Sequence, residues 1–332
     1  MQRKVALTGI KPTGTPHIGN YIGAIRPALK LAETCEARYF IADYHALNAI
    51  KDPQLLKKLT YEIAAAWLAC GLDPEKVLFY RQSQVPETFE LLAMLLAFTP
   101  KGLMNRAHAY KAIVQKNKEE GIDPDDGVNM GLFTYPVLMA ADILLFDTDY
   151  VPVGNDQFQH IEMAVDIAES FNFNYKCNAF KLPAPMATEE TKIVVGLDGR
   201  KMSKSYGNII PLFAPEAELK KLIMRIVTNS QTVEEPKDPD SCNIFALYRN
   251  FATPEQIEAL RQRYLAGGMG WGEAKNELFK VMNACLAPLR DKYYSLLERK
   301  DYIDEILLKG STKARELAGK KMAELRKIIG LA

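Results

Sequence analysis

Short apolar runs alternate with longer amphipathic stretches over the first half of the chain. Apolar runs at residues 4–8, 39–42, 77–80 and 151–153 have the length of buried strands. Helix starts follow near Asn20, at Asp52-Pro53 and near Pro86, where a capping carboxylate or a proline opens the stretch. Strands that alternate with helices predict a parallel sheet with right-handed crossovers.

The remaining pattern predicts helices with one charged loop. Residues 130–146 and 156–171 are predicted as helices, whereas the apolar-poor segment 115–127 is predicted as a mobile loop. Past about Pro211 the alternation stops and only helical patterns follow, including a capping box at Thr253 and a helix boundary at Gly310-Ser311. The sequence therefore predicts an α/β domain over residues 1–210 and an all-helical domain over residues 211–332.

Composition narrows the class of protein without naming a partner. Apolar residues make up 48% and charged residues 25% of the 332 positions, and the formal net charge is +1, which is typical of a soluble globular protein. The five cysteines form no CxxC pair, so neither a zinc knuckle nor a disulfide framework is indicated. No apolar stretch has the length of a membrane span or a secretory signal, so we expect a cytoplasmic protein that does not enter a membrane.

A Gly- and Pro-rich segment, KPTGTPHIGN at residues 11–20, joins the first predicted strand to the first helix. Ligands bind at this position in open parallel sheets, and a helix N-terminus offers unpaired N–H groups to an anion. His17 and Asn20 are both potential donors to a phosphate, and Gly19 lets a nucleotide approach the backbone. The alternative is an ordinary strand-to-helix turn, since neither standard phosphate-loop pattern is present.

A second candidate phosphate site is the segment KMSKS at residues 201–205, which follows an Asp-Gly turn. Lys201 and Lys204 are three positions apart, so they can hold one polyphosphate between two mobile positive charges. Ser203 and Ser205 add hydroxyl donors. The alternative is a solvated basic loop, the usual role of such runs.

A third group of candidate residues lies on one face of the predicted helix 130–146. Tyr135, Met139 and Asp142 are spaced i, i+4 and i+7. The face offers an aromatic wall, an apolar wall and one carboxylate, and a buried carboxylate needs a donor such as an indole N–H. The alternative is a core helix with an incidental aspartate on its solvent side.

These segments together resemble class I aminoacyl-tRNA synthetases, whose two motifs match residues 17–20 and 201–205 in the correct order. Asn20 stands where many members have a second histidine, as is usual in the tryptophanyl branch. The helix with Asp142 resembles the tryptophan-binding helix of that branch, whereas tyrosyl enzymes typically have glutamine at the position of Met139. The resemblance implies a Rossmann-like catalytic domain over residues 1–210 that ends in the KMSKS loop, followed by a helical domain that binds the anticodon of tRNA.

The resemblance also implies roles for individual residues. Catalysis is assigned to His17, Asn20, Lys201 and Lys204. ATP binding is assigned to Lys11, Pro12, Thr13, Gly19, Asn20, Gly154, Asn155, Asp156, Ile193, Lys201, Met202, Ser203, Lys204 and Ser205. Tryptophan binding is assigned to Asp142, Tyr135, Met139, Gln157 and His45, although His45 is equally suited to a structural role at a strand end.

The implied reaction is ATP-dependent activation of L-tryptophan to tryptophanyl-adenylate, followed by transfer to tRNA(Trp) by a homodimer. Mg²⁺ is expected to be held mainly by ATP and water, because no dedicated carboxylate cage or histidine cluster is evident. The basic last helix is a candidate contact for tRNA. A tyrosyl-specific relative and a synthetase paralogue with an adenylate-forming or regulatory role remain as alternatives.

Overall fold

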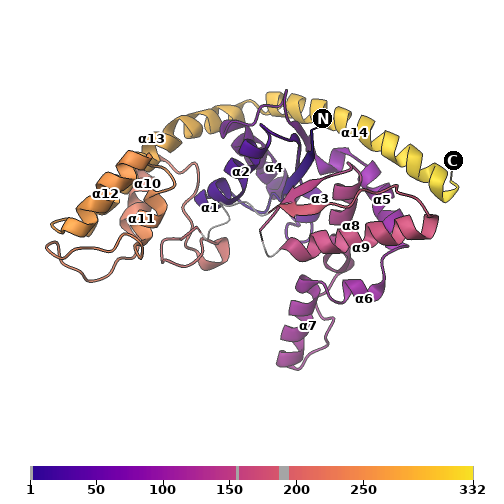
Figure 1. Ribbon diagram of the computed structural model, residues 1–332, viewed down its shortest axis with the longest axis horizontal. Coiled ribbons are helices and arrows are strands. Elements are labelled where there is room, and N and C mark those ends of the chain that lie inside the picture. Colours follow the sequence, from indigo (N-terminus) through magenta and orange to yellow (C-terminus); the bar gives the residue numbers. More distant parts are fainter. Residues whose placement is uncertain (1–2, 155–156, 187–193, 332) are drawn as a thin grey trace.

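A five-stranded, fully parallel sheet lies at the centre of the computed structural model, which describes residues 3–154, 157–186 and 194–331 (Figure 1). The strands lie in the order β3-β2-β1-β4-β5, the order of the first five strands of a Rossmann fold. They are β1 (Val5–Ile10), β2 (Glu36–Ile41), β3 (Leu78–Arg81), β4 (Tyr150–Pro152) and β5 (Ala184–Met186). The predicted α/β class is confirmed, and β5 is an edge strand that the sequence pattern did not reveal.

Helices connect and cover the strands. Those of the first part are α1 (Ile18–Asn20), α2 (Arg26–Leu31), α3 (Asp43–Ala46), α4 (Pro53–Ala69), α5 (Glu87–Leu96), α6 (Lys101–Met104), α7 (His108–Glu120), α8 (Met130–Leu144) and α9 (Phe158–Tyr175), with a π-helical turn, Tyr21–Ile25, between α1 and α2. Those of the second part are α10 (Glu216–Met224), α11 (Asn243–Tyr248), α12 (Pro254–Ala266), α13 (Trp271–Glu298) and α14 (Lys300–Ile329). Helices α10–α12 form an arm at one end of the molecule, and α13 and α14 arch from this arm back over the sheet (Figure 1).

The predicted helix starts follow from local chemistry. The Asp52 side chain accepts hydrogen bonds from the backbone of Gln54 and Leu55 and so caps α4, as the sequence predicts. Thr253 and Gln256 form the predicted capping box of α12. These caps satisfy donors that a helix leaves unpaired, which is why they are visible in the sequence.

Alternate side chains of the strands pack into two hydrophobic clusters, one on each face of the sheet. Tyr39 on β2 and Phe79 on β3 belong to the cluster that includes α4, whereas Phe40 and Tyr80 belong to the cluster that includes α8. Successive strand residues point to opposite faces. Because both faces are covered, the strands are mainly apolar, and this made them recognisable.

The prediction of a mobile loop over residues 115–127 is wrong for its first half. Helix α7 continues to Glu120 and ends at Gly121, which adopts a left-handed conformation. Pairs four residues apart, Gln115 with Glu119 and Lys116 with Glu120, support this exposed helix. The charged composition therefore reflects a solvated helix surface, not a lack of structure.

The predicted helix boundary at Gly310-Ser311 is also wrong, because α14 runs through both residues without interruption. A Cβ atom at Gly310 would lie only 1.8 Å from the carbonyl oxygen of Phe79 in β3. The glycine therefore permits a close approach of α14 to the sheet. The Ser311 hydroxyl, likewise buried, donates to the Gln84 side chain at 2.7 Å.

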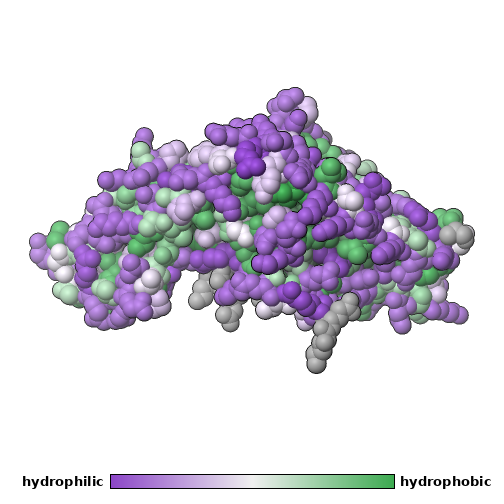
Figure 2. All heavy atoms as spheres, turned by 90° about the horizontal axis from the view of Figure 1, so that it is seen from above, coloured by the Kyte–Doolittle hydropathy of each residue, from purple (hydrophilic) through white to green (hydrophobic). Residues whose placement is uncertain are grey.

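Several basic side chains on α14 pair with carboxylates of the α/β domain. Arg315 pairs with Glu87, Arg326 pairs with Glu90, and the buried Lys321 pairs with Asp147. These three residues fasten the last helix to the sheet domain, so they do not form the free basic face that the sequence suggested. The surface seen from this side is mainly hydrophilic, with smaller apolar patches between polar ones (Figure 2). Within the described residues, no helix is long and apolar enough to cross a membrane.

The close approach at Gly310 can be tested by adding one methyl group. We expect Gly310→Ala to lower the free energy of unfolding by roughly 1–3 kcal/mol, because α14 must move away from the Phe79 carbonyl. Gly319→Ala on the same helix is the matched control: its Cβ meets nothing within 4 Å, so the gain in helix propensity should leave stability unchanged or raise it by up to about 1 kcal/mol. Urea unfolding of both variants measures the difference, and equal stability would contradict the proposed role of Gly310.

Candidate active site

The first motif lies where β1 ends and α1 begins, at the carboxyl edge of the sheet. The backbone N–H of His17 donates to Oδ1 of Asn20 at 3.0 Å, which leaves the Asn20 amide nitrogen as a donor. The His17 side chain is buried, and its Nδ1 has no hydrogen-bond partner among the described residues. A buried ring nitrogen without a partner is costly, so this geometry favours a ligand beside it.

The second motif forms a tight hairpin. Val195 and Lys201 form a β-bridge, and Gly199 takes a left-handed conformation at the turn. The buried Asn208 holds the loop: its Oδ1 accepts from the Ser203 backbone at 2.8 Å, and its Nδ2 donates to Asp198 at 2.6 Å and to the Lys201 carbonyl. Asn208 was not identified from the sequence, where nothing distinguishes it from other loop asparagines.

The two motifs contact each other although they are far apart in the chain. The backbone N–H of Gly19 donates to Sδ of Met202 at 3.3 Å, and that of Ile18 donates to the carbonyl of Ile210 at 2.9 Å. The end of the Lys204 side chain lies against Gly14: a Cβ atom added to Gly14 would be 2.6 Å from Nζ of Lys204. Gly14 has φ of 144°. This approach places the Lys204 ammonium over the first motif.

The two motifs, residues 11–20 and 201–205, meet at a junction whose electrostatics favour a neutral His17. Burial, together with the nearby positive charge of Lys204, lowers the pKa of His17 to about 4. Partial desolvation lowers the pKa of Lys204 from its ordinary value, while Glu62 opposes that shift. The junction therefore offers an ammonium and uncharged donors to an anion.

A cavity of about 260 Å³ lies beside the first motif at the same edge of the sheet. Its walls include Gly9 and Lys11 from the end of β1 and the predicted residues Tyr135, Met139 and Asp142 from α8. His45 and Gln157 also line it. The structure thus brings the five proposed tryptophan-binding residues together around one space, mainly enclosed by apolar side chains.

The Asp142 carboxylate is the most deeply buried charged group of this cavity, with 2% of its surface exposed. His45 Nε2 lies 2.9 Å from its Oδ2, and the Gln82 amide nitrogen lies 2.9 Å from both carboxylate oxygens. Burial raises the pKa of Asp142, while the bonds from His45 and Gln82 oppose that rise. The interpretation of Asp142 as an incidental solvent-side residue is excluded by this burial.

Gln82 is a site residue that the sequence analysis missed. It lies in a short 3₁₀ turn directly after β3 and is fully buried. Polar residues that follow a parallel strand lie at the ligand-binding edge, so its place after the strand at residues 77–80 was an available signal.

A second hydrogen-bonded chain forms another wall of the cavity. The Tyr135 hydroxyl lies 2.5 Å from His160 Nε2, and His160 Nδ1 lies 2.8 Å from Gln157 Oε1. His160 is buried and orients both neighbours, consistent with a structural histidine. Gln157 directly precedes α9, so the start of that helix is tied to α8.

The remaining candidates are placed as follows. Pro12 is buried, Thr13 is exposed and donates its N–H to the Lys11 carbonyl, Lys201 is exposed, and the Ser203 and Ser205 hydroxyls are 2.7 Å apart. Gly154 is partly buried behind β4. Asn155, Asp156 and Ile193 lie outside the described residues.

Metal binding is tested by the donor groups present. In the part of the chain that the structure describes, no group of three or more His, Cys, Asp or Glu side chains could hold a metal ion. A Mg²⁺ ion that accompanies a nucleotide would enter as part of that substrate, coordinated by phosphate oxygens and water.

Comparison with known proteins agrees with this geometry. The family described as tRNA synthetases class I (W and Y) matches residues 2–287. The chain therefore belongs to the class I tRNA synthetases for tryptophan and tyrosine. Tryptophan–tRNA ligases from Pseudomonas aeruginosa and Bordetella pertussis are each 53% identical to it, over 98% of this chain and 73% and 72% of theirs. Within the family the chain thus belongs to the tryptophan–tRNA ligases, which are enzymes, and the resemblance found in its motifs is confirmed.

Solved structures support the same family assignment. The tryptophanyl-tRNA synthetase of Campylobacter jejuni, complexed with ADP and tryptophan, is 46% identical with a TM-score of 0.90, over 98% of this chain and all of that one. The enzyme of Mycoplasma pneumoniae is 29% identical with a TM-score of 0.81, over 100% and 99% of the two chains. A tyrosyl-tRNA synthetase from Aeropyrum pernix, 18% identical with a TM-score of 0.66 over 92% and 89%, shares the fold.

The depressed pKa of His17 predicts acid sensitivity. Its pKa lies near 4 when folded and near 6.5 when unfolded, so the unfolded state takes up a proton first as the pH falls. The stability that a neutral His17 contributes is fully present above about pH 6.5 and is lost as the pH falls toward about 4. We expect His17→Gln to lose less stability than the wild type across this interval.

Thermal unfolding between pH 7 and pH 4 measures the effect. His108→Gln, which removes an exposed histidine, is the control. If the His17→Gln and wild-type curves fall together with pH, the proposed desolvation of His17 is incorrect.

Proposed function

We propose that this enzyme activates L-tryptophan with ATP and transfers it to tRNA(Trp). The observation that carries the proposal is the buried Asp142 carboxylate in an apolar cavity next to the junction of the two phosphate-binding motifs. The named relatives of more than half identity, which are tryptophan–tRNA ligases, support it independently.

In the proposed activation step, a carboxylate oxygen of tryptophan attacks the α-phosphorus of ATP. A phosphorus–oxygen bond forms to the amino acid, the bond to the β-phosphate oxygen breaks, and pyrophosphate leaves. Negative charge moves toward the leaving group, so the Lys201 and Lys204 ammoniums stabilise the transition state more than the ground state. His17 and Asn20 contribute uncharged donors at the start of α1, which attract phosphate without a second fixed charge near Lys204.

The cavity chemistry supports tryptophan over tyrosine. Met139 presents a thioether, which packs favourably against an aromatic ring face. Asp142 is an acceptor and suits the indole N–H, which is a donor only. A phenol would bring a hydroxyl into the same space, and tyrosine would leave the volume of the second indole ring unfilled.

Further parts of the proposal rest on family membership. We infer that the nucleotide enters with Mg²⁺, that the helical part beyond residue 210 binds the anticodon region of tRNA, and that the enzyme works as a homodimer in the cytoplasm. Lys11, Gly154 and the segment 201–205 are proposed ATP contacts. The described range contains no membrane-crossing helix, which is compatible with that location.

The test is pyrophosphate exchange with each of the twenty amino acids, followed by aminoacylation of total tRNA. Tryptophan should dominate both reactions. Exchange led by tyrosine would overturn the specificity, and adenylate formation without tRNA charging would favour a paralogue with another role.

Asp142→Ala should raise the KM for tryptophan sharply and leave the KM for ATP unchanged, because the carboxylate faces the amino-acid cavity.

Gln82 is predicted to position Asp142. Gln82→Met keeps the side-chain volume but removes the donor shared by both carboxylate oxygens. We expect the KM for tryptophan to rise about tenfold, since a hydrogen bond to a charged group contributes roughly 1.5–3 kcal/mol. The KM for ATP should not change.

Gln84→Met is the matched control, because Gln84 lies two residues away in the same 3₁₀ turn but binds Ser311 of α14 instead. Steady-state exchange kinetics of both variants give the comparison. A similar rise in both would assign Gln82 a merely structural role.

A further inference from the structure

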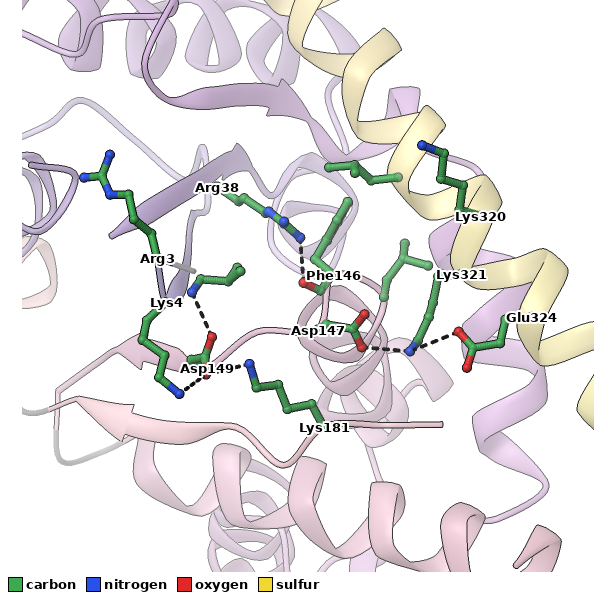
Figure 3. Close-up of a pocket in the computed structure, with 13 residues that line it drawn as sticks. Arg3, Lys4, Arg38, Phe146, Asp147, Asp149, Lys181, Lys320, Lys321 and Glu324 are labelled. Carbon is green, nitrogen blue, oxygen red and sulfur yellow. Dashed lines mark hydrogen bonds and ion pairs between the residues drawn. The ribbon is translucent and has the colours of Figure 1, made fainter. Parts of the chain in front are cut away.

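A second, larger cavity lies at the amino end of the strands, whereas the candidate active site lies at their carboxyl end. Figure 3 shows the residues that line this second cavity. Its volume is about 520 Å³, twice that of the cavity beside the first motif, and within the usual range for small-molecule sites. Lys4 and Val5 lie at the start of β1, and Asp149 directly precedes β4. None of the residues lining it takes part in the proposed reaction.

Basic side chains from several segments converge on this cavity. It is lined by six cations, Arg3, Lys4, Arg38, Lys181, Lys320 and Lys321, and by three carboxylates, Asp147, Asp149 and Glu324. The whole chain has a formal net charge of only +1. Positive charge is therefore concentrated here, although Arg38 is paired with Glu36 outside the cavity.

Two exposed donors of this cavity belong to Lys4 and Lys181. Their ammonium nitrogens lie 2.9 Å and 2.6 Å from the same oxygen, Oδ1 of Asp149, and point toward each other across it (Figure 3). An ammonium has three N–H donors, and neither lysine has another partner within the described residues. Their side chains are 59% and 44% exposed, whereas that of Asp149 is 6% exposed.

The Asp149 carboxylate holds Lys4 and Lys181 together. Burial alone would raise its pKa, but hydrogen bonds from Lys181, the Val5 backbone and Lys4 lower the pKa to about 2, so the carboxylate is ionised. One buried negative charge thus holds two cations at the mouth of a cavity. The pair keeps an excess positive charge and several unused donors.

The opposite wall is formed by α14 and the end of α8. The buried Lys321 donates to the Ala179 carbonyl and pairs with Asp147 and Glu324. The two carboxylates are about half exposed, so this wall disfavours an extended polyanion. A small anion between Lys4 and Lys181 avoids them.

We propose that this cavity is a binding site for a compact phosphate-bearing solute, held by the ammonium groups of Lys4 and Lys181. Lysine recognises phosphate as a mobile point charge with several donors. The acidic wall makes the site unsuited to a nucleic-acid backbone. The site is separate from the activation reaction, so its existence does not depend on the proposed function.

Calorimetric titration with sodium tripolyphosphate tests the proposal. The catalytic site is first filled with tryptophan and an ATP analogue that cannot be cleaved between its α- and β-phosphates, and the ionic strength is held constant. The wild type should bind one further equivalent. Lys4→Gln combined with Lys181→Gln should weaken this binding by about tenfold or more, whereas Lys57→Gln combined with Lys221→Gln, which removes two exposed lysines elsewhere, should not change it.

The Asp149→Asn variant should change the affinity for tripolyphosphate in the opposite direction. Removal of the competing carboxylate should tighten tripolyphosphate binding, whereas a purely structural role of Asp149 predicts weaker binding. The triple variant with both lysine changes and Asp149→Asn leaves no buried charge uncompensated, so it should fold and still fail to bind. No further equivalent in the wild type, weaker binding by Asp149→Asn, or a loss of tRNA affinity without a loss of tripolyphosphate affinity in the lysine variant would each overturn the proposal.

Discussion

A carboxylate buried in an apolar cavity is the constraint on which the substrate site depends. Asp142 is almost fully removed from solvent, and an ionised group in that position is stable only if donors surround it. His45 and Gln82 supply them from the segments that follow β2 and β3. The carboxyl ends of two parallel strands and the helix α8 must therefore be in register before the cavity exists. The parallel sheet thus acts as the scaffold that aligns three separate segments on one charge.

Charge also constrains the contact between the two motifs, residues 11–20 and 201–205. Lys204 lies over the first motif, and a second positive charge on His17 would repel it. Burial and the lysine together keep the histidine neutral, so the two motifs can lie in direct contact through Gly19 and Met202. Charge is concentrated on mobile lysines while the fixed donors are uncharged. The loop at residues 201–205 therefore packs directly on the start of α1.

The sequence predicted those parts of the molecule that depend on local patterns. Strands covered on both faces appeared as apolar runs, and the helix caps at Asp52 and Thr253 were visible because capping chemistry uses few residue types. Features set by distant contacts were missed or misjudged. Gly310 looks like a helix end, and only the nearby Phe79 carbonyl explains it. Gln82 and Asn208 are ordinary polar residues in the sequence, and their roles arise from partners that are 60 and 10 residues away in the chain.

The two edges of the sheet differ in how they use charge. At the carboxyl edge, Asp142 accepts hydrogen bonds from protein donors, and the end of the Lys204 side chain lies against Gly14 of the first motif. At the amino edge, Asp149 holds Lys4 and Lys181 at a cavity mouth, and α14 closes the other side through Lys321. Helix α14 reaches that position because Gly310 lets it pack closely on β3 and because Arg315 and Arg326 bind acidic residues of α5. The last helix of the chain, although it follows the helical arm, is therefore an integral wall of the α/β domain. Its docking connects the geometry of the amino edge to the same strands that carry Gln82 and His45 at the other end.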